Sequence, residues 1–269
     1  MQVPPAPGLR NYVRHYLWIE KADSIDDELR IFGDGNPGIV FCCEGSIYAD
    51  ALRQRPYPPV FGYGQINACR TIYAPHKVKL LIVVLHPFAL SALLKTPAGE
   101  LNDELLTADG LFAAKYATEL EQVMHAAGIA NKLFHINNML SKVFDDSLPG
   151  GEMLVAETIR FIRKLDGNVD SARLSHFSGY SERYLEKQFK QYVGIGPKKF
   201  ARITRLLAYI KLLQKPHPGL TLSSHAHQLG YFDQAHLNHD FKTLTGITPS
   251  AYSHNARVLA LNLITLRQP

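Results

Sequence analysis

The chain has 269 residues, 46% of them apolar and 20% charged, which suits one large globular domain or two ordinary ones. Its formal net charge of +5 is unevenly placed, because residues 151–269 hold 16 Lys and Arg against 8 Asp and Glu while residues 1–150 hold 13 against 16. This asymmetry suggests a module that binds nucleic acid or an anionic membrane beside a mildly acidic one; the alternative is a solvated face with a chance asymmetry. The three cysteines, Cys42, Cys43 and Cys69, form no Cys-x-x-Cys pair, so neither a disulfide framework nor a zinc knuckle is indicated.

No targeting or membrane segment is predicted. Residues 1–10 are rich in Pro and lack the apolar core of a secretion signal. The most apolar run, from Leu80 to Leu94, is interrupted by His86-Pro87 and is shorter than the roughly 20 residues that a membrane span needs. We therefore expect a cytoplasmic protein without a membrane partner.

The N-terminal half is predicted to contain strands first and helices afterwards. Residues 11–20 alternate between two sets of side chains, which is typical of a strand. Further strands are expected at 38–43, 58–64, 68–73 and 78–86. From Pro87 the apolar spacing becomes helical, and helices are also expected at about 110–127 and 131–145. This order predicts an α+β arrangement, with a sheet or barrel-like domain that carries helices.

The C-terminal half is predicted to be all-α. Residues 148–151 are expected to be a linker, because the segment around them is polar and contains Pro and Gly. Beyond the linker almost every segment has helical spacing. Helices are expected at 152–165, 170–178, 181–192, 197–214, 221–229, 233–244 and 248–254, with one more possible at 256–266.

An internal repeat lies within these helices. Six positions recur at a constant offset of 52 residues: Leu185, Phe189, Lys190, Gly194, Pro197 and Phe200 match Leu237, Phe241, Lys242, Gly246, Pro249 and Tyr252. Upstream, Gly179-Tyr180 matches Gly230-Tyr231 at an offset of 51, so the second copy has one added residue inside its turn.

Each copy carries the local signals of a helix, a tight turn and a second helix. Gly179 and Gly230 are the residue type that ends a helix with positive φ. Ser181 and Asp233 are polar residues that can cap the next helix. The Leu and Phe that follow are four residues apart, so both side chains lie on one helix face. The sequence therefore predicts two tandem helix-turn-helix units.

Recognition helices of this kind fit the major groove of double-stranded DNA, where their outward residues contact base edges. Contacts with DNA, including phosphate contacts from flanking Lys and Arg, are expected from Ser181, Arg183, Tyr184, Glu186, Lys187, Lys190, Lys198, Lys199, Arg202, Gln234, Ala235, His236, Asn238, His239 and Lys242. Arg183 and Lys187 can donate to guanine. Gln234 and Asn238 can pair with adenine. The alternative is that these residues form ordinary solvated helix faces.

Three stretches carry a resemblance to a known family: Leu174-Ser175-His176-Phe177-Ser178-Gly179-Tyr180-Ser181, the Leu185 to Pro197 pattern, and Ala226 to Tyr252 with its Gly246-Ile247-Thr248-Pro249-Ser250 string. Over about 152–254 the chain resembles the AraC/XylS family of bacterial transcription regulators. The resemblance implies seven helices, in which a long linker helix at about 197–214 holds the units at about 170–192 and 221–244 apart. It also implies transcription activation, with RNA polymerase as a partner.

The chain departs from the family pattern in both recognition helices. His239 and Lys187 stand where the family usually has a basic residue and Arg, respectively, and Glu186 adds an acid to the first reading face. Because the second reading face has little fixed charge, the first unit and the phosphate contacts are expected to supply most of the affinity.

The N-terminal half resembles the sensor regions of some family members through Leu81–Leu94 and Pro97–Leu101. That resemblance implies binding of a small-molecule effector, homodimer formation or both. Aromatic residues are dense in this half, and the candidate pocket residues are Tyr16, Trp18, Phe41, Phe61, Tyr63 and Tyr73. An ordinary aromatic sheet core is the alternative.

Metal, cofactor and catalytic sites are not predicted. The His225/His227 and His236/His239 pairs lack an evident third and fourth ligand. Gly-x-Ser-x-Gly, Gly-x-Gly-x-x-Gly and Walker motifs are absent from the sequence. Three cysteines without a paired motif argue against the cysteine-based DNA-repair unit found in some relatives.

The sequence thus predicts an effector-binding or dimerisation domain at 1–147 and a DNA-binding domain at 152–269. The expected function is a non-enzymatic regulator of transcription at promoter DNA, controlled by an effector or by dimerisation. The alternative is an enzyme or DNA-repair protein with an N-terminal catalytic site and accessory DNA binding.

Overall fold

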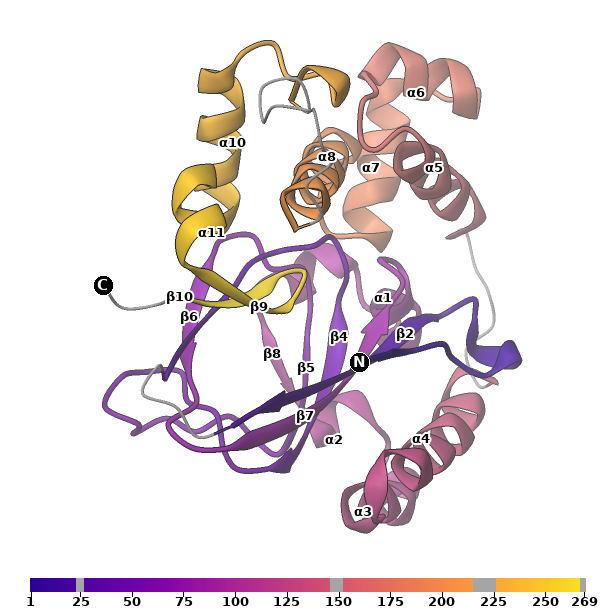
Figure 1. The fold of residues 1–269 in the computed structure, drawn as a ribbon. Helices are drawn as coiled ribbons and strands as arrows, with labels where there is room; N and C mark the ends of the chain where they lie inside the picture. Colours follow the sequence, from indigo (N-terminus) through magenta and orange to yellow (C-terminus); the bar gives the residue numbers. More distant parts are fainter. Residues whose placement is uncertain (23–26, 146–151, 215–225, 267–269) are drawn as a thin grey trace.

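The computed structural model describes residues 1–22, 27–145, 152–214 and 226–266. Two antiparallel sheets occupy the middle of the molecule (Figure 1). The C-terminal helices lie above the sheets in this view, and α3 (Ala117–His125) and α4 (Gly128–Asp145) lie below them. The predicted α+β class is confirmed, and the sheets remain open rather than closing into a barrel.

The larger sheet has six strands in the order β1-β2-β7-β4-β5-β8. These are β1 (Gln2–Val3), β2 (Val13–Lys21), β7 (Val78–Leu85), β4 (Gly38–Glu44), β5 (Val60–Tyr63) and β8 (Leu105–Thr107). The pairing of β2 with β7 sets Tyr16 opposite Val83 and Leu17 opposite Ile82. Since successive strand residues point to opposite faces, this register sends the two pairs into different cores.

The two faces of the larger sheet are both buried. Tyr16 and Val83 pack on the face covered by α3 and α4, together with Ile136 of α4. Leu17 and Ile82 pack on the face that meets the smaller sheet. A sheet covered on both faces explains the nearly continuous apolar sequence of β7.

The smaller sheet joins the two ends of the chain. Its order is β6-β3-β10-β9, built from β6 (Arg70–Tyr73), β3 (Glu28–Ile31), β10 (Leu263–Leu266) and β9 (Ala256–Ala260). The possible helix at 256–266 is therefore wrong, because this segment is a β-hairpin. A short apolar run is ambiguous between helix and strand, and here the free edge of β3 supplies backbone partners that favour the strand.

Short helical turns connect the strands of the N-terminal half. They are η1 (Pro7–Leu9), α1 (Ala89–Leu94), η2 (Ala98–Leu101), α2 (Ala108–Leu111) and η3 (Ala114–Tyr116). The helix expected at 110–127 is broken, because Phe112 is extended and buried between α2 and η3. The strands β1, β3 and β8 were not predicted, since each is too short to show a period.

The C-terminal helices begin and end close to their predicted limits. They are α5 (Glu152–Lys164), α6 (Ser171–Ser178), α7 (Glu182–Tyr192), α8 (Pro197–Gln214), α10 (Gln234–Thr245) and α11 (Pro249–Asn255). Residues 226–228 are also helical. The predicted linker at 148–151 and the first part of the helix expected at 221–229 lie outside the described residues.

The N-terminal and C-terminal halves are in contact through both hydrogen bonds and apolar packing. Arg163 of α5 donates to the Asn36 side chain at 2.8 Å, and Asn102 donates to the carbonyl of Gly194 at 2.7 Å. Phe32 comes from the N-terminal half but is fully buried in the core of the C-terminal helices. These contacts hold the helices on the sheets.

Candidate nucleic-acid interface and cavity

The first helix-turn-helix unit consists of α6 and α7. The Asp170 carboxylate caps α6, which ends at Gly179 with a φ of +74°. The Ser181 hydroxyl then caps α7 by accepting a backbone hydrogen bond at 3.3 Å. Leu185 and Phe189 are buried on the inner face of α7. The predicted glycine turn, serine cap and apolar pair are all confirmed.

The second unit repeats this arrangement with residues 226–228 and α10. Gly230 has a φ of +78°, and the Asp233 carboxylate accepts a backbone hydrogen bond at 2.7 Å from the first turn of α10. Leu237 and Phe241 are buried in the same way as their counterparts in the first unit. The local chemistry of the repeat therefore produces the same turn twice.

Helix α8 packs against both units. Its residue Phe200 lies edge-on to Phe189 of the first unit, with ring centroids 6.2 Å apart. Further along α8, the Tyr209 ring lies 6.4 Å from Tyr231 and 6.3 Å from Phe241 of the second unit. One rigid helix thus sets the relative placement of the two recognition helices.

The outward faces of α7 and α10 are open to solvent. Exposed residues on or beside these faces are Ser181, Arg183, Tyr184, Lys187, Lys190, Gln234, Ala235, His236, Asn238, His239 and Lys242, while Glu186 is half-buried. Lys190 Nζ lies 3.7 Å from Glu186 Oε1, which partly neutralises that acid. The side chains expected to contact bases are therefore accessible.

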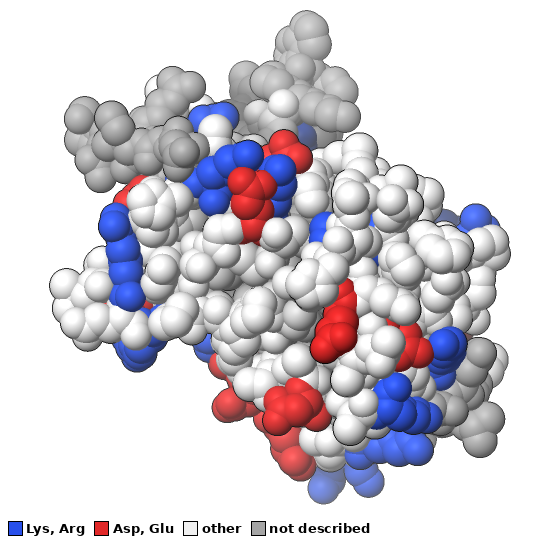
Figure 2. Space-filling model, turned by 90° about the horizontal axis from the view of Figure 1, so that it is seen from below, with Lys and Arg blue, Asp and Glu red and all other residues white. Residues whose placement is uncertain are grey.

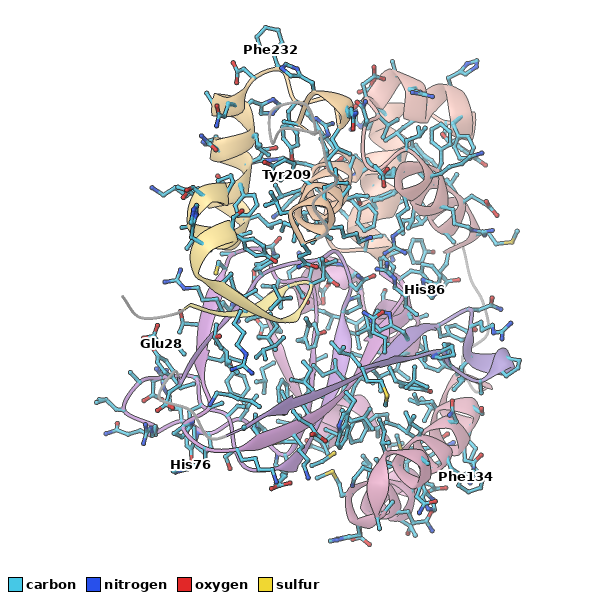
Figure 3. The ribbon with its side chains drawn as sticks, in the orientation of Figure 1. Glu28, His76, His86, Phe134, Tyr209 and Phe232 are labelled. Carbon is cyan, nitrogen blue, oxygen red and sulfur yellow. The ribbon has the colours of Figure 1, made fainter. Side chains whose placement is uncertain are left out.

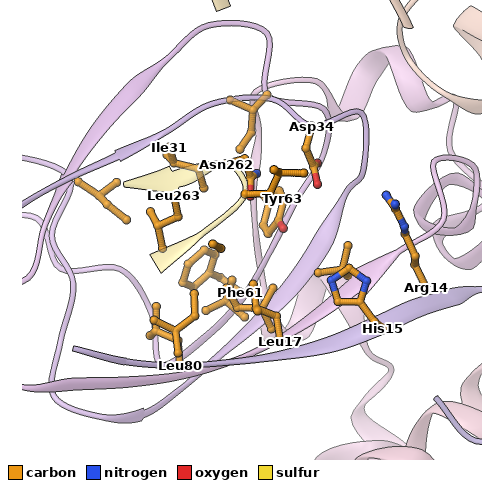
Figure 4. Close-up of a pocket in the computed structure, with 18 of the residues that line it drawn as sticks. Arg14, His15, Leu17, Ile31, Asp34, Phe61, Tyr63, Leu80, Asn262 and Leu263 are labelled. Atoms are coloured by element: carbon orange, nitrogen blue, oxygen red, sulfur yellow. The ribbon is translucent and has the colours of Figure 1, made fainter. Parts of the chain in front are cut away.

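A cavity of about 570 Å³ lies between the two sheets (Figure 4). Most of its wall is aliphatic or aromatic and comes from both sheets, including Leu17, Ile31, Phe61, Leu80 and Leu263. The polar side chains Arg14, His15, Asp34 and Tyr63 gather toward one end. A mostly apolar cavity with a few converging polar groups is the usual form of a small-molecule site.

Ionisable side chains lie at the polar end of the cavity and close to it. Burial, with the nearby Arg14 charge, lowers the pKa of His15 to about 4, so this imidazole is neutral at pH 7. Burial, with the same Arg14 charge, lowers the pKa of Arg163 to about 10, which leaves its guanidinium charged. Burial raises the pKa of the Asp34 carboxyl, against hydrogen bonds from Asn36. The Asp34 carboxyl is thus attracted both by Arg14, which lines the cavity, and by Arg163, which lies outside its wall.

Comparison with known proteins identifies the helical half. A helix-turn-helix domain family matches residues 174–255, and a family described as a domain of unknown function (DUF6597) matches residues 1–107. Residues 174–255 form an AraC-type helix-turn-helix domain. No curated protein matches the chain.

Solved structures of ToxT from Vibrio cholerae share the fold of this chain. One ToxT crystal form matches with a TM-score of 0.50 at 12% identity, over 88% of this chain and 97% of ToxT. An apo form of a ToxT variant matches with a TM-score of 0.50 at 13% identity, over 88% and 96% of the two chains. A ToxT structure with a bound unsaturated fatty acid has a TM-score of 0.49 at 14% identity, over 88% and 94%.

The aromatic residues predicted to line a pocket in the N-terminal half divide between two places. Phe61 and Tyr63 line the cavity. Tyr16, Trp18 and Phe41 do not, because they point to the opposite face of the larger sheet and pack toward α3 and α4. Tyr73 on β6 is also absent from the wall. The number of aromatic residues on a strand does not show which of them face a cavity. Strand alternation decides which face each side chain points to, and the cavity lies on the face that meets the second sheet.

Two of the residues predicted to contact phosphates are engaged within the protein. Arg202 Nε lies 2.9 Å from Oδ1 of Asp240, and the Asp240 side chain is only 4% exposed. Lys199 Nζ donates to the Asn67 side chain at 2.5 Å, across the boundary between the halves. Lys198 is exposed at the start of α8. The sequence did not reveal these partners because they are distant along the chain.

Phe232 is a candidate contact that the sequence reasoning missed. Its side chain is 85% exposed, directly before the Asp233 cap of α10. Figure 3 shows it at the end of the molecule, pointing away from the helices. Phe232 is the residue added in the second turn of the repeat, so the change of offset from 52 to 51 was the signal that could have found it.

Residues 1–22, 27–145, 152–214 and 226–266 contain no group of three His, Cys, Asp or Glu residues placed to hold a metal ion. Across them no helix has the length and apolar character needed to cross a membrane. On the face seen from below, charged side chains form small groups, some mixed and some of one sign, with wide uncharged areas between them (Figure 2).

Proposed function

We propose that this AraC-type regulator binds promoter DNA by placing α7 and α10 in successive segments of the major groove. The observation that carries the proposal is the pair of capped helix-turn-helix units, with solvent-exposed outer faces, that pack on the common helix α8. A recognition helix presents its N-terminal residues to base edges in this arrangement.

We propose that the first unit reads guanine through Arg183 and Lys187, and that the second reads adenine through Gln234 and Asn238. Arg and Lys donate to guanine O6 and N7, and Gln or Asn pairs with adenine N6 and N7. All four side chains are exposed. Lys198 and Lys242 are exposed nearby and are proposed to contact phosphates.

A gel-shift experiment on genomic fragments tests DNA binding. The fragments include the upstream region of the protein's own gene, and folding is verified by circular dichroism. We expect a specific shift whose affinity falls steeply with salt, because phosphate contacts release counterions. Folded protein that shifts no fragment specifically at low salt would contradict the proposal.

We propose that the cavity between the sheets binds the effector, a mainly apolar molecule with a negatively charged head. The long apolar wall favours such a body, and the Arg14 guanidinium at the polar end favours such a head. Among the described residues the Arg14 guanidinium is attracted by the Asp34 carboxyl but makes no direct hydrogen bond or ion pair. It is therefore available to a ligand.

The fluorescent anion 8-anilinonaphthalene-1-sulfonate, an apolar aromatic sulfonate, is the probe for this site. We expect saturable fluorescence enhancement that weakens about tenfold in Arg14→Gln, since a charge-assisted contact is lost. Arg55→Gln is the matched control, because Arg55 is an exposed surface residue paired with Asp50 outside the cavity wall. Equal weakening in both variants would contradict the assignment of the head group to Arg14.

We propose a binding role rather than a catalytic one for the cavity. Its wall is largely apolar, and the Asp34 carboxylate accepts hydrogen bonds from Asn36, which occupy it. A bound effector is expected to be recovered chemically unchanged after long incubation, which mass spectrometry can establish. We also propose that the regulator contacts RNA polymerase and forms a homodimer at the promoter. A cytoplasmic location follows from this proposal, because bacterial promoter DNA lies in the cytoplasm.

A further inference from the structure

The C-terminal hairpin ties the second helix-turn-helix unit to the smaller sheet. β9 begins at Ala256, the residue that ends α11, so no linker separates the unit from the hairpin. In the turn, the Asn262 side chain donates to the carbonyl of Phe32 at 3.0 Å, and the Phe32 amide donates to the Asn262 carbonyl at 3.1 Å. The hairpin is thus an extension of the DNA-binding half that is bonded into the N-terminal half.

Two neighbouring residues of β10 face in opposite directions. Leu263 is 3% exposed and packs in the core between the two sheets. Ile264 is fully buried in the core of the C-terminal helices. Because β10 alternates between these cores, it cannot leave one of them without leaving the other.

The hairpin also forms part of the cavity wall. Ala260, Leu261, Asn262 and Leu263 all line the cavity, opposite strands of the larger sheet. Figure 4 shows Asn262 and Leu263 on the hairpin, facing the same space as Phe61 and Tyr63. A molecule in the cavity would therefore touch both the strands of the N-terminal half and the segment that directly follows α11.

We infer that the hairpin completes the effector site, and that a ligand in the cavity holds the second helix-turn-helix unit against the N-terminal half. This inference rests on the proposed effector site and names its regulation. A ligand shifts a conformational equilibrium only by its difference in affinity for the two states. Here that difference comes from residues 260–263, which contact the ligand only while the hairpin is docked.

Hydrogen exchange of the unmodified protein tests the inference, with 8-anilinonaphthalene-1-sulfonate as the probe. With the probe at about ten times its Kd, opening of the docked hairpin should become about tenfold rarer. We expect amide exchange to slow by that factor in β9 and β10, in their partner β3 and in α11. Slowing confined to the larger sheet would overturn the inference.

Variants of the hairpin test its contact with the probe. Leu263→Ser removes an apolar side chain from the cavity wall and is expected to weaken probe binding about tenfold. Asn262→Ala, which removes the side-chain bond to Phe32, is expected to weaken it by a smaller factor with less effect on folding. Val258→Ser is the matched control, since Val258 lies on β9 with 41% exposure and outside the cavity wall.

The outcomes separate this inference from the proposed effector site. If the unmodified protein does not bind the probe saturably, the effector site itself fails. If the probe binds the parent, Leu263→Ser, Asn262→Ala and Val258→Ser equally, the effector site stands and the role of the hairpin is wrong. Selective weakening in Leu263→Ser and Asn262→Ala, together with slowed exchange in α11 of the parent, supports the inference.

Discussion

Arg202 of α8 and Asp240 of α10 form an ion pair with 2.9 Å between Nε and Oδ1, and the Asp240 side chain is almost fully buried. This pair fastens the linker helix to the second recognition helix. We expect Arg202→Ala to lower the free energy of unfolding by about 1–3 kcal/mol, because it leaves a buried carboxylate without its cation; solvent access to Arg202 keeps the loss below that of a fully buried pair. Urea unfolding measures the change.

The same variant shows whether Arg202 also contacts DNA. Since its guanidinium is held by Asp240, we expect Arg202→Ala to leave the slope of log affinity against log salt unchanged. A phosphate contact would instead reduce that slope by about one. Lys198→Ala, which removes an exposed cation from the start of α8, provides the comparison and is expected to reduce the slope.

Lys187→Ala and Asn238→Ala are expected to weaken DNA binding at different half-sites. Each side chain is exposed on its own recognition helix, and losing a base contact costs about 1–3 kcal/mol. Titrations against operators mutated in one half-site at a time measure this. Lys164→Ala on α5 is the control, an exposed lysine outside both recognition helices. Unchanged affinity and sequence preference in both variants would show that the reading faces are misassigned.

Phe189→Ala and Phe241→Ala are expected to destabilise their helix-turn-helix units by about 3–5 kcal/mol each. Both rings are fully buried, and each lies edge-on to an aromatic ring of α8. Thermal unfolding followed by circular dichroism measures the loss. Phe177→Ala, at a 44% exposed position on α6, should have a much smaller effect. Full thermal stability in either core variant would contradict the described packing.

Phe232→Ala is expected to weaken DNA binding without lowering stability. The ring is 85% exposed and precedes the cap of α10, so its removal costs the folded protein little while a contact with a thymine methyl group or the backbone is lost. The expected loss of affinity is about three- to tenfold, measured by fluorescence anisotropy on the operator. Asp233→Ala contrasts with it, since loss of the cap should lower stability as well. Affinity equal to that of the parent would remove Phe232 from the interface.

The stability of the protein is expected to fall as the pH is lowered from about 6.5 to 4. Burial and neighbouring arginines lower the pKa of His15 and of His86 to about 4, whereas an unfolded histidine titrates near 6.5. Between these pH values the unfolded chain binds protons that the folded chain does not. The contribution of the two histidines to the free energy of unfolding is therefore complete above about pH 6.5 and is lost as the pH falls toward about 4. Figure 3 places His86 between the sheets and the C-terminal helices.

Urea midpoints across that pH range, compared between the parent and its His15→Gln and His86→Gln variants, measure this dependence. Each substitution should flatten the curve. The raised pKa of Asp34 acts in the opposite direction, because the folded state then binds the extra proton. The difference between parent and variant curves isolates the histidines, and identical curves would contradict their burial in neutral form.

The two helix-turn-helix units could be predicted from the sequence because their signals are local. Gly179 and Gly230 reverse a helix end, Ser181 and Asp233 cap the next one, and each requirement concerns a few neighbouring residues. The repeat doubled the signal. Local chemistry of this kind does not depend on where the rest of the chain lies, so it can be read without a fold.

Only the tertiary structure decided which residues of the two halves are in contact. A possible helix at 256–266 became a hairpin because β3 offered unpaired backbone groups from the other end of the chain. The cavity lies between Leu17 and Leu263, which are distant in sequence. Arg202 of α8 pairs with a carboxylate on another helix, that of Asp240 on α10. Sheet pairing, a hollow between faces and a buried ion pair all depend on residues that meet only after folding.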